Sequence, residues 1–252
     1  MYYDYAMAAP FMSGVNEKEE LSILILGNGT GTYATQCKRY FDQINITGVE
    51  IDQKITNLAV KYFELPEDVP VTTYDGRAYL NAVDDKYDVI MVDAYQDITI
   101  PFQMSSIEFF TLVRDHLNDD GVMVVNMNMK GSGEGNINQY LSDTIGNVFS
   151  QVYTVDVKNN TNQELFASNN PDMINTFTKN ASLEDDPELV SMMEKISDNL
   201  VIYNSGNYIM TDDKAPVELL GMRVIDDIIR DEVDWYKNVY EEKGIDGVIE
   251  AL

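Results

Sequence analysis

The segment LSILILGNGTGTYATQCKRYFDQINITGVEID, residues 21–52, carries the strongest structural signal in this chain. An apolar run from Ile23 to Leu26 stops at three closely spaced glycines, and a segment with helical spacing then leads to a second apolar run that ends at Glu50. The order strand, glycine loop, helix, strand is the opening βαβ unit of a nucleotide-binding α/β sheet. A carboxylate at the end of the second strand can accept hydrogen bonds from both hydroxyls of a ribose. The segment therefore predicts a nucleoside site.

The glycine spacing narrows the choice of nucleoside. Gly27, Gly29 and Gly31 read G-x-G-x-G, whereas a dinucleotide fingerprint reads G-x-G-x-x-G and would place its third glycine at Thr32. This spacing disfavours a nicotinamide-dependent oxidoreductase, and no Gly-Lys-Ser/Thr follows that would make a phosphate P-loop. A tight loop of this kind suits S-adenosylmethionine, which carries no phosphate. The alternative is a glycine-rich turn in some other α/β protein.

Acidic residues dominate the charge of the chain. Seventeen basic against 43 acidic residues give 252 residues a net charge of −26. Such a field repels phosphate backbones and anionic lipids, so nucleic acid is not an expected partner, whereas a cation such as a polyamine is attracted. The simpler alternative is that the acids form a solvated surface.

Metal and disulfide chemistry are not expected. The single cysteine, Cys37, excludes an internal disulfide and a thiolate cluster, and its place in the first helix predicts a core residue. The single histidine, His116, precedes a turn and is expected at a helix C-terminus. The N-terminal residues lack the basic region of a signal peptide, and no run approaches the ~20 apolar residues of a membrane span. We expect a cytoplasmic protein, or the soluble part of a longer membrane-attached one.

Acidic residues also follow three successive predicted strands. Val71 to Tyr74 ends at Asp75-Gly76, and the continuously apolar run from Tyr87 to Val92 ends at Asp93, as the earlier strand ends at Glu50. Runs of this kind separated by helices are typical of parallel strands buried on both faces, and ligands bind at the carboxyl ends of such strands. Each acid taken alone could instead cap the following helix. Together they predict a site at one edge of the sheet.

The remaining pattern indicates the sheet type. A fifth apolar run covers 121–127, and two later runs, 151–157 and 164–168, flank an Asn-rich turn and can pair as an antiparallel hairpin. Parallel strands that finish in such a hairpin, with helices on both faces, predict an α/β, Rossmann-like, methyltransferase-type fold. The loop over 94–104 carries Tyr95, Gln96 and Asp97 above the predicted pocket, where loops usually supply substrate contacts.

Three parts of the chain are expected to serve one domain. Residues 1–20 form an N-terminal segment in which Tyr2 and Tyr3 could fold back over the glycine loop as a lid. Residues 21–168 form the S-adenosylmethionine-binding domain. Residues 169–252 are acidic and helical and are expected to pack on the same domain, with Trp235 against its body.

Six motifs in order carry a family resemblance: LILGNGTGTYATQ, VEID, YDGRAYL, YDVIMVDAY, IPFQMSSIEFF and DDGVMVVN. Over roughly residues 1–168 the chain resembles the spermidine synthase-like branch of class I S-adenosylmethionine-dependent transferases. The resemblance implies three groups of site residues. Asp93 would help to deprotonate the attacking amine. The cofactor would contact Gly27, Gly29, Gly31, Glu50, Ile51, Asp75 and Gly76, and the acceptor would contact Tyr2, Tyr3, Tyr95, Gln96 and Asp97.

The resemblance also implies an activity. It predicts an enzyme that binds S-adenosylmethionine or its decarboxylated form and transfers an aminopropyl or methyl group to a small amine-type acceptor such as a polyamine, without a metal and as a homodimer. The chain departs from spermidine synthases at Thr30 and Gln96, where they carry aspartates, and at Tyr3, where they carry histidine. These departures leave open a non-catalytic nucleoside-binding protein that has kept the fold.

Overall fold

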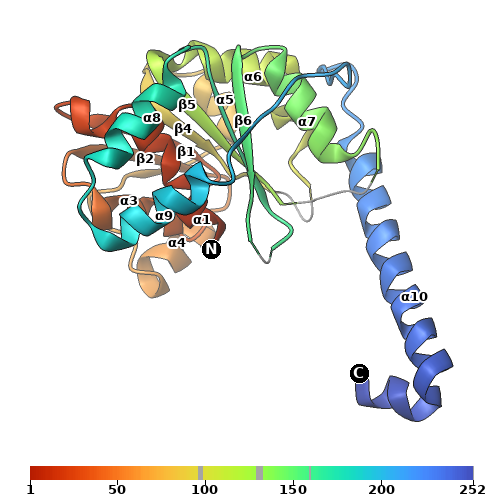
Figure 1. The fold of residues 1–252 in the computed structure, drawn as a ribbon. Helices are drawn as coiled ribbons and strands as arrows, with labels where there is room; N and C mark the ends of the chain where they lie inside the picture. Colours follow the sequence, from red (N-terminus) through yellow and green to blue (C-terminus); the bar gives the residue numbers. More distant parts are fainter. Residues whose placement is uncertain (96–98, 129–132, 159, 252) are drawn as a thin grey trace.

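A single mixed sheet forms the centre of the molecule in the computed structural model, which describes residues 1–95, 99–128, 133–158 and 160–251. Its strands are β1 (Leu21–Leu26), β2 (Ile44–Glu50), β3 (Val71–Thr73), β4 (Tyr87–Val92), β5 (Leu117–Met127), β6 (Gln151–Asp156), β7 (Gln163–Ser168) and β8 (Val201–Ile202). Across these described ranges they lie in the order β3-β2-β1-β4-β5-β7-β6-β8. Figure 1 shows the sheet with helices on both sides.

The pairing confirms the predicted α/β fold. The first five strands run parallel, β7 pairs antiparallel with β5, and β6 pairs antiparallel with β7. The whole of β4 is buried, because alternate residues face two different cores: Val89 and Met91 belong to one, and Ile90 and Val92 to the other. Because β7 runs antiparallel to β5, the turn between β6 and β7 lies beside the carboxyl end of β5.

Two helical layers cover the sheet. One layer contains α1 (Tyr2–Ala6), α2 (Ala8–Met12), α3 (Thr32–Tyr40), α4 (Gln53–Tyr62), α8 (Met173–Ser182) and α9 (Pro187–Ser197). The other contains α5 (Gly76–Leu80), α6 (Ile107–Asp115) and α7 (Ile137–Gly146). Short 3-10 turns lie at Val15–Glu17 and Phe102–Met104. His116 is the C-cap of α6, as the sequence predicts.

Short polar side chains fix where several helices begin. Asp52 accepts a hydrogen bond from the Lys54 backbone N–H at the start of α4, and Ser106 accepts one from Phe109 N–H at the start of α6. Such caps satisfy amide groups that have no partner within the helix. Because α4 and α6 start directly above the carboxyl edge of the sheet, their caps also hold the loops of that edge in place.

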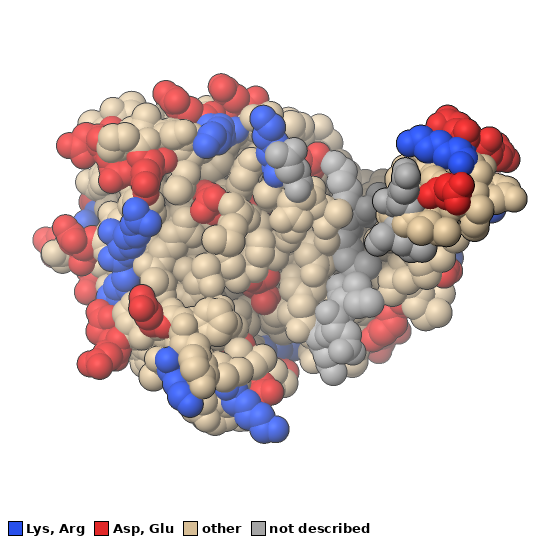
Figure 2. All heavy atoms as spheres, turned by 90° about the horizontal axis from the view of Figure 1, so that it is seen from below, with Lys and Arg blue, Asp and Glu red and all other residues tan. Residues whose placement is uncertain are grey.

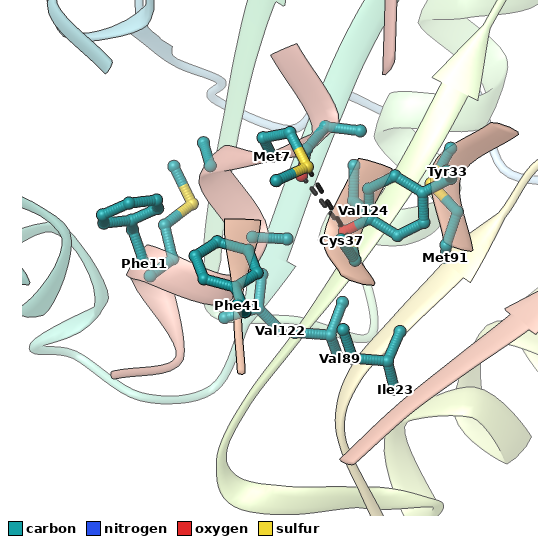
Figure 3. Close-up of a cluster of buried hydrophobic side chains, with 14 of the residues drawn as sticks. Met7, Phe11, Ile23, Tyr33, Cys37, Phe41, Val89, Met91, Val122 and Val124 are labelled. Atoms are coloured by element: carbon teal, nitrogen blue, oxygen red, sulfur yellow. Dashed lines mark hydrogen bonds between the residues drawn. The ribbon is translucent and has the colours of Figure 1, made fainter. Parts of the chain in front are cut away.

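The layer containing α1 and α3 packs through sulfur and aromatic side chains. Figure 3 shows Met7, Tyr33 and Cys37 lying close together, and Val124 of β5 belongs to the same buried cluster. The Cys37 thiol is fully buried and donates to Met7 Sδ at 3.8 Å. Burial raises the pKa of this thiol to about 12. The prediction that Cys37 belongs to the core is therefore confirmed, and the thiol is not a reactive one.

The C-terminal part corrects one expectation. Helices α8 and α9 do pack on the domain, and β8 extends its sheet, but α10 (Val217–Ala251) buries only its first turns, through Val217, Leu220 and Val224. Beyond them α10 projects from the body (Figure 1), and Trp235 is 51% exposed. The expected packing of Trp235 is wrong: apolar residues of α10 after Val224, among them Ile228, Ile229 and Val233, share one side of the helix with Trp235, and that side stays exposed beyond the body.

On the face drawn in Figure 2 the acidic residues are dispersed. Figure 2, seen from below, shows Asp and Glu around the periphery with Lys and Arg between them, and mostly uncharged atoms in the centre. None of the described helices is both long enough and apolar enough to cross a bilayer.

Candidate active site

A cavity of about 710 Å³ opens at the carboxyl edge of the sheet. The glycine loop, the ends of four parallel strands, the hairpin turn and α1 all contribute to its wall. Its lining residues are Tyr2, Tyr3, Gly27, Gly29, Val49, Glu50, Ile51, Ile55, Tyr74, Asp75, Gly76, Asp93, Ala94, Tyr95, Pro101, Gln103, Met104, Asn126, Asn128, Thr161 and Asn162.

Most of the predicted site residues meet in this cavity. Ten of them line it: Tyr2, Tyr3, Gly27, Gly29, Glu50, Ile51, Asp75, Gly76, Asp93 and Tyr95. Gly31 does not line it, and it serves instead as the N-cap of α3 beside Leu65. Gln96 and Asp97 lie outside the residues that the structure describes. A larger hollow of about 970 Å³ lies between α1, α3 and α9, but it contains none of the three strand-end carboxylates.

The glycine loop requires glycine most strictly at its first position. Gly27 has φ +86°, and a Cβ there would stand 2.5 Å from the Asp93 carbonyl oxygen. Gly29 has φ +53° with no atom within 4 Å of such a Cβ. The backbone at Gly27, after β1, therefore lies so close to Asp93, after β4, that no side chain fits between them.

Glu50 closes the loop from the opposite side. Its side chain is only 6% exposed, and its two oxygens accept hydrogen bonds from the backbone N–H groups of Gly29 at 2.8 Å and Asp52 at 3.0 Å. Each carboxylate oxygen can accept more than one bond. The residue thus fits the ribose-binding role predicted for it while it also holds the glycine loop.

Asp75 has two roles at its strand end. Its Oδ1 accepts from Ala78 N–H at 2.8 Å and caps α5, so the capping alternative raised by the sequence is correct for this residue. The same residue lines the cavity beside Ile51, Tyr74 and Met104. These apolar side chains form a wall that suits a flat heterocyclic base.

Asp93 is held on both carboxylate oxygens. Asn126 donates its Nδ2 to Oδ1 at 2.8 Å, and the Tyr2 hydroxyl donates to Oδ2 at 2.8 Å. Burial raises the pKa of Asp93 to about 6, although the hydrogen bonds from Asn126 and Tyr2 act in the opposite direction. The group is therefore ionised at neutral pH, yet its pKa lies close enough to neutrality for proton transfer.

Three tyrosines surround this carboxylate. The rings of Tyr2 and Tyr3 lie 4.0 Å apart, and α1 carries both into the cavity wall. Burial and the nearby Asp93 charge raise the pKa of both hydroxyls, so they remain protonated donors. The Tyr95 hydroxyl donates to the Asn126 carbonyl oxygen and accepts from Asn128 N–H at 3.1 Å. Its hydroxyl is thereby engaged with the backbone at the end of β5.

The sequence prediction missed the asparagines of the site. Asn126 ends the motif DDGVMVVN at the edge where ligands bind, and that position is the signal that could have identified it. Asn162 donates its Nδ2 to Asn126 Oδ1 at 2.6 Å, which orients Asn126 toward Asp93. Asn162 arrives from the hairpin turn, and no local pattern marks its approach.

The charge of the cavity is one-sided. Its described lining includes the carboxylates of Glu50, Asp75 and Asp93, and it includes no lysine, arginine or histidine. An arrangement of this kind favours a cationic ligand over an anionic one.

Comparison with known proteins places this geometry in a family. Residues 2–163 match the model described as "Spermine/spermidine synthase domain". The "Probable polyamine aminopropyl transferase" of Bifidobacterium longum (strain NCC 2705) is 52% identical over 269 aligned residues, which cover 100% of this chain and 59% of the relative. The "Polyamine aminopropyltransferase" of Alkaliphilus metalliredigens (strain QYMF) is 30% identical, over 49% of this chain and 45% of the relative. The match thus spans little more than half of one relative and less than half of the other.

Solved structures agree with the fold. A "probable spermidine synthase" from Corynebacterium glutamicum ATCC 13032 superposes with a TM-score of 0.60 and 20% identity, over 71% of this chain and 70% of that one. Human "Methyltransferase-like protein 13", solved in complex with SAH, gives a TM-score of 0.62 and 20% identity, over 78% and 90%. These two likenesses concern the fold. On the sequence match, which covers more than half of its length, the chain belongs to the spermine/spermidine synthase family.

Proposed function

We propose that this protein transfers an aminopropyl group from decarboxylated S-adenosylmethionine to a small amine. The observation that carries the proposal is the cavity itself, in which three carboxylates and no basic side chain are present among the described lining residues. Both reactants suit such a cavity, because the donor is a sulfonium cation and an alkyl amine is protonated at neutral pH. The name of the 52% identical relative agrees with this activity.

The residues fit a nucleoside donor. Glu50 would accept hydrogen bonds from the ribose hydroxyls, and the apolar wall of Ile51, Tyr74 and Met104 would cover the base beside Asp75. The glycine loop allows the ligand to approach the backbone closely. Thr30, which stands where spermidine synthases carry an aspartate, does not line the cavity, and its hydroxyl is 3.2 Å from that of Thr32.

Asp93 supplies the proton chemistry of the proposed reaction. The donor provides a carbon bonded to a positively charged sulfur; the amine nitrogen bonds to this carbon as the carbon–sulfur bond breaks, and a neutral thioether leaves. Before attack the ammonium must lose one proton, and the free lone pairs of the Asp93 carboxylate can accept it. Asn126 and Tyr2 fix both oxygens of that carboxylate, so its orientation is set before the amine arrives.

The same charges favour the decarboxylated donor over intact S-adenosylmethionine. The intact molecule carries an additional carboxylate, which would enter a cavity that already contains three acids. Without a basic side chain in the described wall, that carboxylate would lack a charged partner.

Product analysis tests the proposal. The protein is incubated with decarboxylated S-adenosylmethionine and 1,4-diaminobutane, and mass spectrometry follows the aminopropylated amine and methylthioadenosine in equal amounts. Formation of S-adenosylhomocysteine from intact S-adenosylmethionine, with no aminopropyl product, would replace the proposal with methyl transfer. Binding of the donor without any product over a broad set of amines would support the non-catalytic alternative.

Glu50→Gln should weaken donor binding by about 10- to 100-fold, because hydrogen bonds to a charged group contribute about 1.5–3 kcal/mol. The carboxylate now accepts hydrogen bonds from the backbone N–H groups of Gly29 and Asp52, and the NH2 of the glutamine amide cannot accept one of them. Calorimetric titration with methylthioadenosine measures the change. The matched control is Glu67→Gln, an exposed acid after α4, which should bind like the unaltered protein. Equal affinities for the two variants would contradict the ribose-binding role.

A further inference from the structure

A fourth carboxyl group lies beside the cavity, outside its lining. Glu164, in the middle of β7, is fully buried and stands opposite Asn126 of β5 and Val155 of β6 in the sheet. It follows Asn162 by two residues, so the two side chains share a face, and Asn162 lines the cavity. Asn126, the residue opposite Glu164, also lines the cavity and donates to Asp93.

No hydrogen bond satisfies this carboxyl group. Both of its oxygens are without a partner among the described residues. Asp143 of α7, which is equally buried, shows the usual arrangement: it accepts from the Tyr203 hydroxyl and from the backbone N–H groups of Gly206 and Tyr208. A buried acid without partners destabilises a fold, and an ionised one does so far more. Glu164 therefore requires an explanation other than packing.

The groups that face Glu164 come from three directions. Asp93 follows β4 and is the charged group that acts on it. Tyr3 of α1, Tyr33 of α3 and Tyr95 after β4 are the phenols whose ionisation it opposes. No lysine, arginine or histidine acts on it within the described ranges. Burial, followed by the Asp93 charge, holds the pKa of Glu164 well above its usual range, so it carries a proton when no cation is near.

We propose that Glu164 couples the binding of the acceptor amine to the release of a proton. The inference rests on the proposed function, since it concerns the amine that would lie beside Asp93. When an ammonium group binds there, its positive charge opposes the field of the Asp93 carboxylate and favours ionisation of Glu164. Before binding, Glu164 is protonated and the amine is an ammonium ion in solution. After binding, Glu164 is a carboxylate, the amine is still an ammonium ion, and one proton has passed from Glu164 to solvent.

The linkage has a reciprocal consequence. An ammonium bound to the protein with ionised Glu164 is held by a second negative charge, which acts through the low-dielectric interior rather than by contact. Glu164 thus acts on the acceptor through its charge, and it favours a cationic acceptor over a neutral one. A neutral alcohol or thiol of the same size would release no proton and gain no such attraction.

Calorimetry of the complete protein tests the coupling. Titration with 1,4-diaminobutane in two buffers of different ionisation enthalpy, at about pH 7.5, counts the protons released per amine bound. Asp93 is almost fully ionised at that pH and has no proton to release. The ammonium groups of the diamine could also lose a proton on binding, but such a release would persist when Glu164 is replaced. We expect release from the unaltered protein and from the Glu67→Gln control. Loss of release is expected in both Glu164→Gln and Glu164→Met, which keep the length of the side chain but cannot ionise.

Stability distinguishes this role from a structural one. Both Glu164 variants should unfold at the same or a higher temperature than the unaltered protein, because neither loses a hydrogen bond and Glu164→Met removes an unsatisfied group. Amine binding without proton release in the unaltered protein, or release that persists in both variants, would overturn the role of Glu164 and leave the proposed function intact. Failure of the unaltered protein to bind the diamine at all would overturn the proposed function, and this inference with it.

Discussion

Asp93→Asn should lower the turnover of decarboxylated S-adenosylmethionine and diamine by about 10²–10⁴-fold, the usual contribution of a positioned general base. The amide has nearly the same shape and can keep a hydrogen bond from Tyr2 or Asn126, but it cannot take a proton from the amine. Donor affinity should change little, because Asp93 is assigned to the acceptor. Single-turnover kinetics and methylthioadenosine titration measure the two effects separately.

The pH dependence adds an independent check on Asp93. Its pKa lies at about 6, raised by burial, and the base acts only when it is ionised. The value of kcat/KM should therefore fall as pH decreases through about 6, by tenfold per pH unit below it, and the Asp93→Asn variant should lack this limb. Asp185→Asn, which changes an exposed acid before α9, is the control and should behave like the unaltered protein. Retention of most of the turnover in Asp93→Asn would exclude its role as the base.

Gly27→Ala should damage the site and the fold together. The added Cβ would stand 2.5 Å from the Asp93 carbonyl oxygen and 2.7 Å from Ala94 Cα, both of them backbone atoms, at a φ of +86°. Left-handed strain contributes about 1–2 kcal/mol and overpacking about 1–3 kcal/mol, so the loss of unfolding free energy should be about 2–5 kcal/mol. Because the displaced backbone belongs to Asp93, turnover should fall even where the variant remains folded.

The neighbouring glycines provide graded controls for Gly27. Gly29→Ala meets no atom within 4 Å and should lose only about 1–2 kcal/mol from its positive φ. Gly31→Ala would contact the Leu65 side chain at 2.4 Å, which can move, so its effect should be intermediate. Urea unfolding of the three variants measures the order. A Gly29→Ala variant as unstable as Gly27→Ala would contradict the close approach of β1 and β4.

Local patterns predicted the parallel half of the sheet and its ligand edge well. Continuous apolar runs placed β1, β2 and β4, and the residues that end β2 and β4, Glu50 and Asp93, do line one cavity. The same rule would have identified Asn126 at the end of β5. Asp75 shows where the rule is incomplete, since one residue can cap a helix and line a cavity at once.

Contacts between segments that lie far apart in the chain could not be predicted from the sequence. Asn162 and Glu164 approach Asp93 only because β7 returns antiparallel beside β5, a pairing whose register depends on the assembled sheet. The position of Gly31 in the G-x-G-x-G loop similarly gave no sign that it faces Leu65 rather than the cavity. Helical spacing predicted α10 itself, but it did not show that only the first turns of this helix pack on the body.

The most direct test of the proposed function compares two donors that differ by one carboxylate. Calorimetric titration of the protein with decarboxylated and intact S-adenosylmethionine, under the same buffer and salt, measures how the acidic cavity discriminates between them. The account predicts at least about tenfold tighter binding of the decarboxylated form, which corresponds to about 1.4 kcal/mol. Equal affinity, or tighter binding of intact S-adenosylmethionine, would contradict the proposed aminopropyl transfer.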